Sequence, residues 1–557
     1  MTMRFGMLMA LLALLVACKG EEPTKTPAAA RAENAAAARP AASSQDVVTP
    51  VYGGRIVQAT IGEPSNLIPN LATDSSSASV TGLLYISLLR YDKNLNLVPY
   101  AAQSYEVLDG GKRIRFHLRR DIVWQDGAPL TARDVEFTYK MMIDPKTPTA
   151  YGDDYKAVSE FRLIDDYTFE VLYDKVFARS LITWAGEIVP RHILEHENLL
   201  ETKYAREPVG AGPYMLKEWV PGRYLVLTAN PRYFLGRPYV DRIILRIIPD
   251  TGTQFMELKA HNLDMMDLTP KQYLFQTEGP EWRKDFTKYK YVSFGYTYLG
   301  YNLKNPLFTD RRVRQALAHA IDKQEIIKIV LFGLGMPAVG PYKPGTWVYD
   351  DKIASFSYDP EKARAMLAEA GWRDTDGDGI LDKDGRPFAF TILTNQGNEQ
   401  RSKTAIIIQE RLRQIGIKVE IRTIEWASFI KEFINPGNFD AVILGWSTTV
   451  DPDNYTVWHS SQTPPQGLNF VHYANPEVDR LLEEGRETLD QAVRKRIYDR
   501  IQELLHDDQP YCFLYVPYAL PIVSARIRGI EPAPAGITYN FERWWIEPSR
   551  SQPALTQ

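Results

Sequence analysis

The chain has 557 residues, and its 65 Lys and Arg against 69 Asp and Glu give a formal net charge of −4. This near-neutral balance, without a basic block, argues against nucleic acid as a partner, and the length calls for two or three packed units. Cysteine occurs only at Cys18 and Cys512, which excludes an intramolecular disulfide framework and a cysteine metal site.

The N-terminus has the pattern of an export signal. Arg4 supplies a positive start, and the 13 residues from Phe5 to Ala17 are uncharged and apolar. That run is shorter than the roughly 18 residues that span a bilayer, so residues 1–17 are predicted to be a signal peptide. It ends in Leu15-Val16-Ala17-Cys18, which resembles a bacterial lipobox and predicts lipidation of Cys18. A secretory signal with a chance cysteine is the alternative.

Residues 18–51 differ in composition from the rest of the chain. They are rich in alanine and contain no aromatic residue, so they bury too little apolar surface to offset the entropy of ordering. We predict a lipidated cysteine followed by a disordered tether. The alternative is a polar-faced, alanine-rich helix.

The first half of the remaining chain is predicted to contain strands and hairpins in mixed sheets. Thr131 to Asp134 resembles a capping box that opens a helix through Met142. The other expected elements are a strand at 55–61 and hairpins at 103–108 with 113–118, 161–163 with 168–172, and 214–219 with 224–227.

The second half alternates helices and strands, which predicts βαβ units with parallel pairing. The expected helices are 359–370, 403–414 and 426–434, and the strands are 388–393, 418–423 and 440–444. Ligands in such sheets bind beyond the carboxyl ends of the strands. The loop Gly445 to Asp453 is therefore a candidate binding loop, with Trp446, Asp451 and Asp453 as candidate contacts. The alternative is a Trp packed under a surface turn with solvated aspartates.

An Asp- and Gly-rich segment has the spacing of a calcium loop. Oxygen ligands would come from Asp374, Asp376, Asp378, the carbonyl of Ile380, and Asp382. Gly385 stands where an EF-hand needs a bidentate Glu, so a plain acidic turn is the alternative. The chain is thus expected to require no cofactor, with a structural calcium ion possible.

One segment matches an enzyme motif. His192, Glu195 and His196 fit the H-x-x-E-H pattern of a metallopeptidase group, in which two histidines bind zinc and the glutamate acts as base. No third ligand is placed, and no G-x-S-x-G or phosphate loop occurs. A metallopeptidase remains the enzymatic alternative, but we expect a protein that is not an enzyme.

Several segments between residues 52 and 548 resemble, in the same order along the chain, motifs of the family 5 extracellular solute-binding proteins. These are the dipeptide, oligopeptide and nickel binding components of ABC importers. These segments are Gly54–Val57, Glu63–Leu67, Leu88–Asp92, Phe116–Arg119, Trp124–Val135, Pro208–Tyr214, Asp310–Asp322 and Phe439–Asp453. Within Trp124–Val135, Asp126 and Gly127 suit a turn over a buried Trp124, so we interpret this segment as structural.

The resemblance implies an α/β, two-lobed periplasmic-binding-protein fold of type II, enlarged and cluster C-like, with mixed β-sheets and a hinge between the lobes. Lobe one would comprise 52–301 plus 522–548, and lobe two 302–521. The chain would cross near residues 301–302 and again near 515–521, so that hinge closure encloses the solute. The protein would be a monomer at the periplasmic or extracellular face that delivers its solute to ABC permease subunits.

The resemblance also bears on the solute. Peptide-binding members place an aspartate three residues after the Trp of the binding loop, where this chain has Thr449; Asp451 or Asp453 could substitute. On lobe one, Glu63 and Asp74 occupy cleft positions, although Asp74 equally suits a helix N-cap. Peptides are the leading solute class, with oligosaccharides, metal chelates and a sensing role without transport as alternatives.

Overall fold

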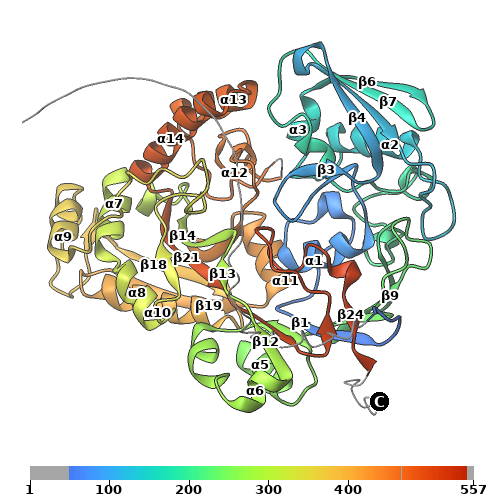
Figure 1. Ribbon diagram of the computed structural model, residues 1–557. Helices are drawn as coiled ribbons and strands as arrows, with labels where there is room; N and C mark the ends of the chain where they lie inside the picture. The colour runs from blue at the N-terminus through green and yellow to red at the C-terminus, as the bar shows by residue number, and fades with distance from the viewer. Residues whose placement is uncertain (1–48, 466, 549–557) are drawn as a thin grey trace, which may run out of the picture. The chain divides into compact units, whose positions relative to one another are not determined.

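The computed structural model describes residues 49–465 and 467–548 (Figure 1). The predicted signal peptide 1–17, Cys18 and nearly all of the tether lie outside these residues. Among the described helices, none is both long and apolar enough to cross a membrane. The described residues from Pro50 onward form one unit.

A seven-stranded mixed sheet organises the first half of the chain. Its strand order is β12-β22-β11-β1-β10-β9-β8, with β1 parallel to β10 and to β11. The hairpin predicted at 214–227 is the β8–β9 pair of this sheet. The strands are β1 (Arg55–Thr60), β8 (Tyr214–Val220), β9 (Tyr224–Ala229), β10 (Arg242–Ile247), β11 (Met265–Asp267), β12 (Phe286–Lys288) and β22 (Pro521–Ser524).

A four-stranded antiparallel sheet, in the order β4-β5-β7-β6, contains the other two predicted hairpins. The capping box at Thr131 and Asp134 is confirmed, and it opens α2. This sheet comprises β4 (Ala102–Leu108), β5 (Arg113–Leu118), β6 (Val158–Asp165) and β7 (Thr168–Tyr173). The helices of this half are α1 (Ser75–Leu84), α2 (Ala132–Ile143), α3 (Asp153–Lys156), α4 (Arg191–Leu194), α5 (Thr251–Lys259) and α6 (Pro280–Asp285).

A second seven-stranded sheet organises the other half, in the order β13-β21-β14-β20-β18-β19, with β15 also paired to β21. The predicted βαβ units are confirmed, because β18 is parallel to both β19 and β20. The strands are β13 (Tyr291–Val292), β14 (Gly295–Tyr301), β15 (Gly335–Pro337), β18 (Ala389–Asn395), β19 (Lys418–Ile424), β20 (Ala441–Ser447) and β21 (Tyr511–Ala519).

Helices cover this second sheet, and Figure 1 shows α7, α8, α9 and α10 grouped beside it. The helix predicted at 426–434 is one short α-turn, α11, followed by a π-helical segment at Phe429–Ile434. The helices are α7 (Arg311–Ala320), α8 (Lys323–Ile329), α9 (Pro360–Glu369), α10 (Glu399–Arg413), α11 (Trp426–Ser428), α12 (Tyr455–Trp458), α13 (Pro476–Glu487) and α14 (Gln491–Asp508).

The chain passes between the two large sheets at residues 289–290 and at Leu520. The passage at Leu520 falls within the predicted range 515–521. The first passage lies before the predicted one at 301–302, because β14 pairs with β20 and β21 and so belongs to the second sheet. The two passages are neighbours, since the Tyr289 N–H donates to the Pro521 carbonyl at 2.9 Å.

We refer to the residues before 289 and after 520 as lobe one, and to residues 291–519 as lobe two. Each lobe has its own core. In lobe one, Trp124 and Phe116 are fully buried among residues of the four-stranded sheet and α2. In lobe two, separate clusters lie on the two faces of the sheet, one around Leu299 and Ile392 and the other around Trp458. The cluster around Trp458 also includes Ala150 of lobe one, so the two lobes make apolar contact there.

Candidate functional site

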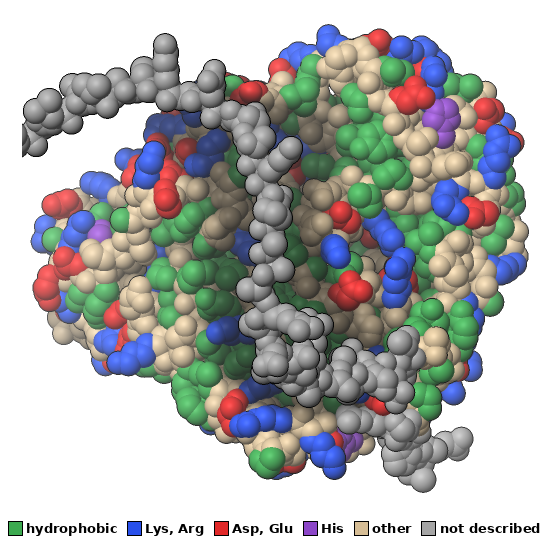
Figure 2. Space-filling model, viewed as in Figure 1, with side chains coloured by type: hydrophobic (Ala, Val, Ile, Leu, Met, Phe, Trp, Pro, Cys, Tyr) green, Lys and Arg blue, Asp and Glu red, His purple; other side chains and the backbone are tan. Residues whose placement is uncertain are grey.

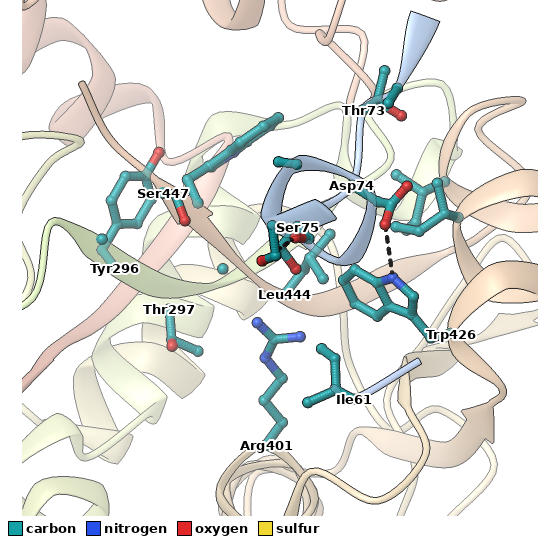
Figure 3. Close-up of a pocket in the computed structure, with 18 of the residues that line it drawn as sticks. Ile61, Thr73, Asp74, Ser75, Tyr296, Thr297, Arg401, Trp426, Leu444 and Ser447 are labelled. Atoms are coloured by element: carbon teal, nitrogen blue, oxygen red, sulfur yellow. Dashed lines mark hydrogen bonds between the residues drawn. The ribbon is translucent and has the colours of Figure 1, made fainter. Parts of the chain in front are cut away.

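A cavity of about 650 Å³ is lined by both lobes, a volume within the range typical of small-molecule sites. Lobe one contributes Ile61, Tyr151 and, around the start of α1, Ala72 to Ser75 with Ala78 and Ser79. Lobe two contributes residues of β14 and β20, together with Arg401, Trp426 and Phe470. Backbone, hydroxyl and aromatic groups thus surround a space in which Asp74 and Arg401 are the charged lining residues (Figure 3).

Asp74 is both the N-cap of α1 and a wall of the cavity. Its carboxylate accepts hydrogen bonds from the Ser77 N–H at 2.9 Å, from the hydroxyls of Ser65 and Ser77, and from Trp426 Nε1 at 3.2 Å. All four donors are neutral. The cap predicted for Asp74 is therefore present, and its negative charge faces the cavity without a cationic partner among the described residues.

Arg401 enters the cavity from the first turn of α10 on lobe two (Figure 3). Its Nη1 donates to Asn395 Oδ1 at 2.7 Å, and no carboxylate of the described residues forms an ion pair with it. Burial lowers the pKa of Arg401 below its ordinary value, with Tyr515 and Tyr298 opposing that shift. A half-buried guanidinium with spare donors can bind a carboxylate of the solute in a bidentate manner.

The predicted binding loop divides into two parts. β20 extends to Ser447, so Trp446 lies in the strand, half-buried; it stacks on Phe470 at 5.5 Å and its Nε1 donates to the Tyr511 hydroxyl. Trp446 lines the cavity. Thr449 is exposed and lines an adjoining pocket, and its hydroxyl donates to the Asp451 carbonyl at 2.9 Å. The structure thus brings Trp446 to the cavity and Thr449 to its margin.

Asp451 and Asp453 lie in ion pairs that join the lobes. Arg179 of lobe one pairs with both carboxylates at 3.3 Å, and Arg494 pairs with Asp451 at 3.0 Å. Arg486 Nε pairs with Asp453 at 2.7 Å. With two arginines on each carboxylate, neither is a free partner for the ammonium group of a solute.

The network continues into lobe one at α3. Arg486 Nη1 pairs with Asp153 at 2.7 Å and its Nη2 with Asp154, while Arg179 pairs with Asp154 at 2.8 Å. Burial by itself raises the pKa of Asp453, but Arg486 and Arg179 hold it below its ordinary value. We call Asp153, Asp154, Arg179, Asp451, Asp453, Arg486 and Arg494 the interlobe ion network.

Glu63 lies away from the cavity. Its carboxylate accepts from Trp219 Nε1 at 2.7 Å, and Arg206 pairs with it at 3.4 Å while packing over the Trp219 ring. Glu63 is not among the residues that line the cavity. Its contacts hold the loop after β1 against β8.

The two predicted metal motifs have different outcomes. His192 Nε2 lies 2.6 Å from Asp126, and Glu195 pairs with Arg191, so the H-x-x-E-H residues are engaged separately. In the described part of the chain, one group of three or more His, Cys, Asp or Glu side chains could hold a metal, and it consists of Asp374, Asp376 and Asp382. Asp378 is not in that group, and its carboxylate accepts from the Ile380 N–H.

Sequence reasoning missed Arg401, Tyr151 and Trp426. A signal for Arg401 was present, since it follows Asn398 at the helix start beyond the carboxyl end of β18, the position at which parallel sheets bind ligands. Trp426 carried the same signal, since it begins α11 just beyond the carboxyl end of β19. Tyr151 carried no such signal.

Comparison with known proteins agrees with this architecture. Residues 96–467 match the family described as bacterial extracellular solute-binding proteins, family 5 Middle. The chain is 36% identical to the oligopeptide-binding protein AppA of Bacillus subtilis (strain 168), over 98% of each chain. The structure of AppA from B. subtilis in complex with a nonapeptide superposes with a TM-score of 0.86 and 36% identity, covering 89% of this chain and 100% of that one.

Two further structures widen the range of solutes among its relatives. DppA from Helicobacter pylori in complex with the peptide STSA has a TM-score of 0.80 and 26% identity, covering 89% of this chain and 99% of that one. NikZ from Campylobacter jejuni in complex with Ni(L-His) has a TM-score of 0.79 and 26% identity, covering 88% and 99%. The chain belongs to the family 5 bacterial extracellular solute-binding proteins.

Proposed function

We propose that this protein captures peptides between its two lobes and delivers them to the permease of an ABC importer. The observation that carries the proposal is the pair of opposite charges in the cavity, Asp74 on lobe one and Arg401 on lobe two. A peptide has an ammonium group at one end and a carboxylate at the other, so it complements both. Bound between the lobes, it favours closure, because only the closed arrangement contacts both ends. The peptide complexes of AppA and DppA support this solute class.

A second solute class, metal chelates, would fit part of the same site. NikZ was captured with a nickel complex of an amino acid, and the carboxylate of such a chelate suits Arg401. The cavity lining contains no His or Cys among the described residues, so a chelate would bind whole rather than donate its metal. This leaves Asp74 without a partner, which favours the peptide.

The membrane attachment is part of the proposal. A lipid on Cys18 and a tether up to residue 51 hold the solute-binding unit near the membrane and raise its effective concentration at a permease. The unit acts as a monomer and binds its solute without catalysis. Globomycin, an inhibitor of the lipoprotein signal peptidase, should cause a lipid-modified precursor to accumulate, whereas Cys18→Ser should abolish lipid labelling.

The experiment that tests the function is identification of the natural solute. We expect mass spectrometry of the protein purified without denaturation to find copurified peptides, and free peptides to raise the melting temperature. The matched probes are a peptide, the same peptide with its N-terminus acetylated or C-terminus amidated, an oligosaccharide and a nickel–histidine complex. Stabilisation by the sugar or the chelate with none by peptide would overturn the proposal.

We also propose that the loop at residues 374–382 binds calcium weakly and structurally. Oxygen atoms of Asp374, Asp376 and Asp382 lie within 4.8 Å of one another, which fits an oxygen-liganded cation. Backbone N–H groups of Gly377 and Gly379 already bond to Asp374, so the loop needs no ion to fold. Millimolar CaCl₂ should raise the melting temperature of wild type but not of Asp374→Asn/Asp376→Asn; an equal rise in both would refute the site.

A further inference from the structure

A side pocket of about 290 Å³ in lobe one adjoins the main cavity. The two spaces share three lining residues, Ala72, Ala78 and Tyr151. Two of these have only a methyl side chain and the third presents an aromatic ring. The two spaces therefore meet beside two methyl groups and one aromatic ring, with no charged side chain among the shared lining residues.

Glu187 lines this side pocket, and no side-chain partner of its carboxylate occurs among the described residues. Its backbone is held, because the Glu187 carbonyl accepts from Asn70 Nδ2 at 3.2 Å and the residue bridges to Ser87. Burial raises the pKa of Glu187 above its ordinary value. A half-buried carboxylate without a counter-charge is costly, and a cation beside it would remove that cost.

The other charged groups of the side pocket are already paired. Arg179 and Asp154 both line it, and they bond to each other at 2.8 Å within the interlobe ion network. Asn70 is 6% exposed, and its Oδ1 atom has no hydrogen-bond donor among the described residues. The Glu187 carboxylate therefore lacks a cation, and Asn70 Oδ1 lacks a hydrogen-bond donor, among the described residues.

The remaining walls suit an aliphatic stem. Met142, Ile182 and Pro69 are apolar, and the Tyr151 ring can pack against methylene groups or a cation. The pKa of the Tyr151 hydroxyl is raised, chiefly by burial and further by the negative charges of Asp74 and Glu187. Glu187 and Tyr151 thus line the same side pocket.

We infer that this side pocket is a subsite for a cationic side chain of the solute, with lysine as the ligand that fits best. The lysine stem would pass between Ala72, Ala78 and Tyr151, and its ammonium group would bond to Glu187. This inference rests on the proposed peptide function and assigns one side chain of the peptide to a named pocket. Arginine presents a wider, planar guanidinium, whereas the lysine ammonium is a compact point charge.

The test compares lysine with norleucine, which has a similar aliphatic stem and no ammonium group. Tetra-alanine and its single-substituted variants, with Lys or norleucine at each of the four positions, would be titrated calorimetrically. We expect Lys to bind at least about tenfold more tightly than norleucine at one position, as a charge-assisted hydrogen bond to a half-buried carboxylate should give. At the other positions the two residues should bind alike.

Variants connect the preference to Glu187. Glu187→Gln should abolish the preference for Lys while leaving the norleucine affinities within about twofold of wild type. The matched control is Glu218→Gln, the same charge change at an exposed position on β8, which should keep the preference. Equal binding of Lys and norleucine at all positions, or a preference that persists in Glu187→Gln, would overturn the subsite alone. Failure of every peptide to bind, with correctly folded protein, would overturn the proposed function as well.

Discussion

At the scale of single residues, Arg401 carries the most specific expectation. Its guanidinium faces the cavity and bonds to Asn395 rather than to a carboxylate (Figure 3). We predict that Arg401→Gln weakens binding of a free-acid peptide by about 1.5–3 kcal/mol, roughly 10- to 160-fold, the range for a hydrogen bond to a charged group. Calorimetric titration of wild type and variant measures this loss.

The control for Arg401 lies in the solute. A peptide with an amidated C-terminus lacks the carboxylate, so wild type and Arg401→Gln should bind it with similar affinity. Arg401→Lys should recover part of the affinity for the free acid, because it keeps the charge without the bidentate geometry. An equal loss for both peptides would mean that Arg401 supports the fold of the site and does not bind the carboxylate.

His506 gives a prediction for pH. Burial lowers the pKa of His506 to about 4, with Lys323 adding to the shift, and its ring stacks on Phe356 at 4.6 Å. In the unfolded chain His506 takes up a proton near pH 6.5, whereas in the folded protein it does so only near pH 4. Protonation therefore favours the unfolded chain, and the free energy of unfolding decreases as the pH drops from 6.5 to 4. The full loss is about 3 kcal/mol, at 1.36 kcal/mol per pKa unit.

The measurement for His506 is urea unfolding between pH 7 and pH 4. His506→Phe keeps the stacked ring and removes the titrating group, so its stability should fall less steeply than that of wild type over this interval. The comparison cancels the titration of all other groups. Parallel curves for the two proteins would show that His506 has an ordinary pKa in the folded state.

At the scale of elements, the start of α1 combines two roles that can be separated. Asp74 caps the helix and presents a charge to the cavity, whereas serine caps equally well without the charge. We predict that Asp74→Ser lowers stability by about 1 kcal/mol, the size of a lost side-chain hydrogen bond, and weakens binding of a peptide with a free N-terminus. Urea unfolding and calorimetry measure the two effects separately.

An N-acetylated peptide completes the test of Asp74. It carries no ammonium group, so Asp74→Ser should not change its affinity. If Asp74→Ser binds both the free and the acetylated peptide with the affinities of wild type, then Asp74 caps α1 and does not bind the solute.

Helices and strands that are specified by residues close together in the sequence could be predicted from the sequence. The three hairpins and the parallel β18–β19 and β18–β20 pairs agree with it, because turn residues and hydrophobic periodicity are local signals. The end of β20 was harder to predict. Gly445 to Ser447 have the composition of a loop, and they are part of the strand because β14 pairs with them. Strand pairing over long sequence distance likewise moves the first interlobe passage to residues 289–290.

The candidate site was predictable only where one segment supplies it. Trp446 was found because it follows a predicted strand. Asp451 and Asp453 had the right location, but their partner Arg179 lies more than 270 residues away in the chain, and no local pattern announces that pairing. Without it, the two carboxylates look free to bind a solute.

At the scale of the whole unit, two neighbouring strand passages connect the lobes while the interlobe ion network bridges them elsewhere. Figure 2 shows a hollow between the two lobes on the face in view. The passages at residues 289–290 and Leu520 are held side by side, so they can bend together as a hinge. Arg179 pairs with Asp451 and Asp453 across the lobes, and Arg486 pairs with Asp153 and Asp154. These crossing pairs require the lobes to be together, so their free energy contributes to the balance between open and closed protein, and through that balance to the apparent affinity for any solute.

We predict that Asp153→Asn/Asp154→Asn shifts this balance towards the open state. The two carboxylates lie on lobe one and face Arg486 of lobe two, so their neutralisation removes interlobe attraction and leaves a buried guanidinium with fewer partners. Small-angle X-ray scattering should show a larger radius of gyration in the absence of solute, and peptide affinity should fall about tenfold, which corresponds to about 1.4 kcal/mol.

The matched control breaks an ion pair within one lobe. Arg494 pairs with Asp451, both in lobe two, so Arg494→Gln should lower the melting temperature with little change in the radius of gyration. Salt provides an independent test, because 1 M NaCl shortens the screening length to about 3 Å and should weaken peptide binding more in wild type than in the double variant. A double variant with the wild-type radius, affinity and salt dependence would mean that apolar contacts and the hinge, not these ion pairs, determine closure.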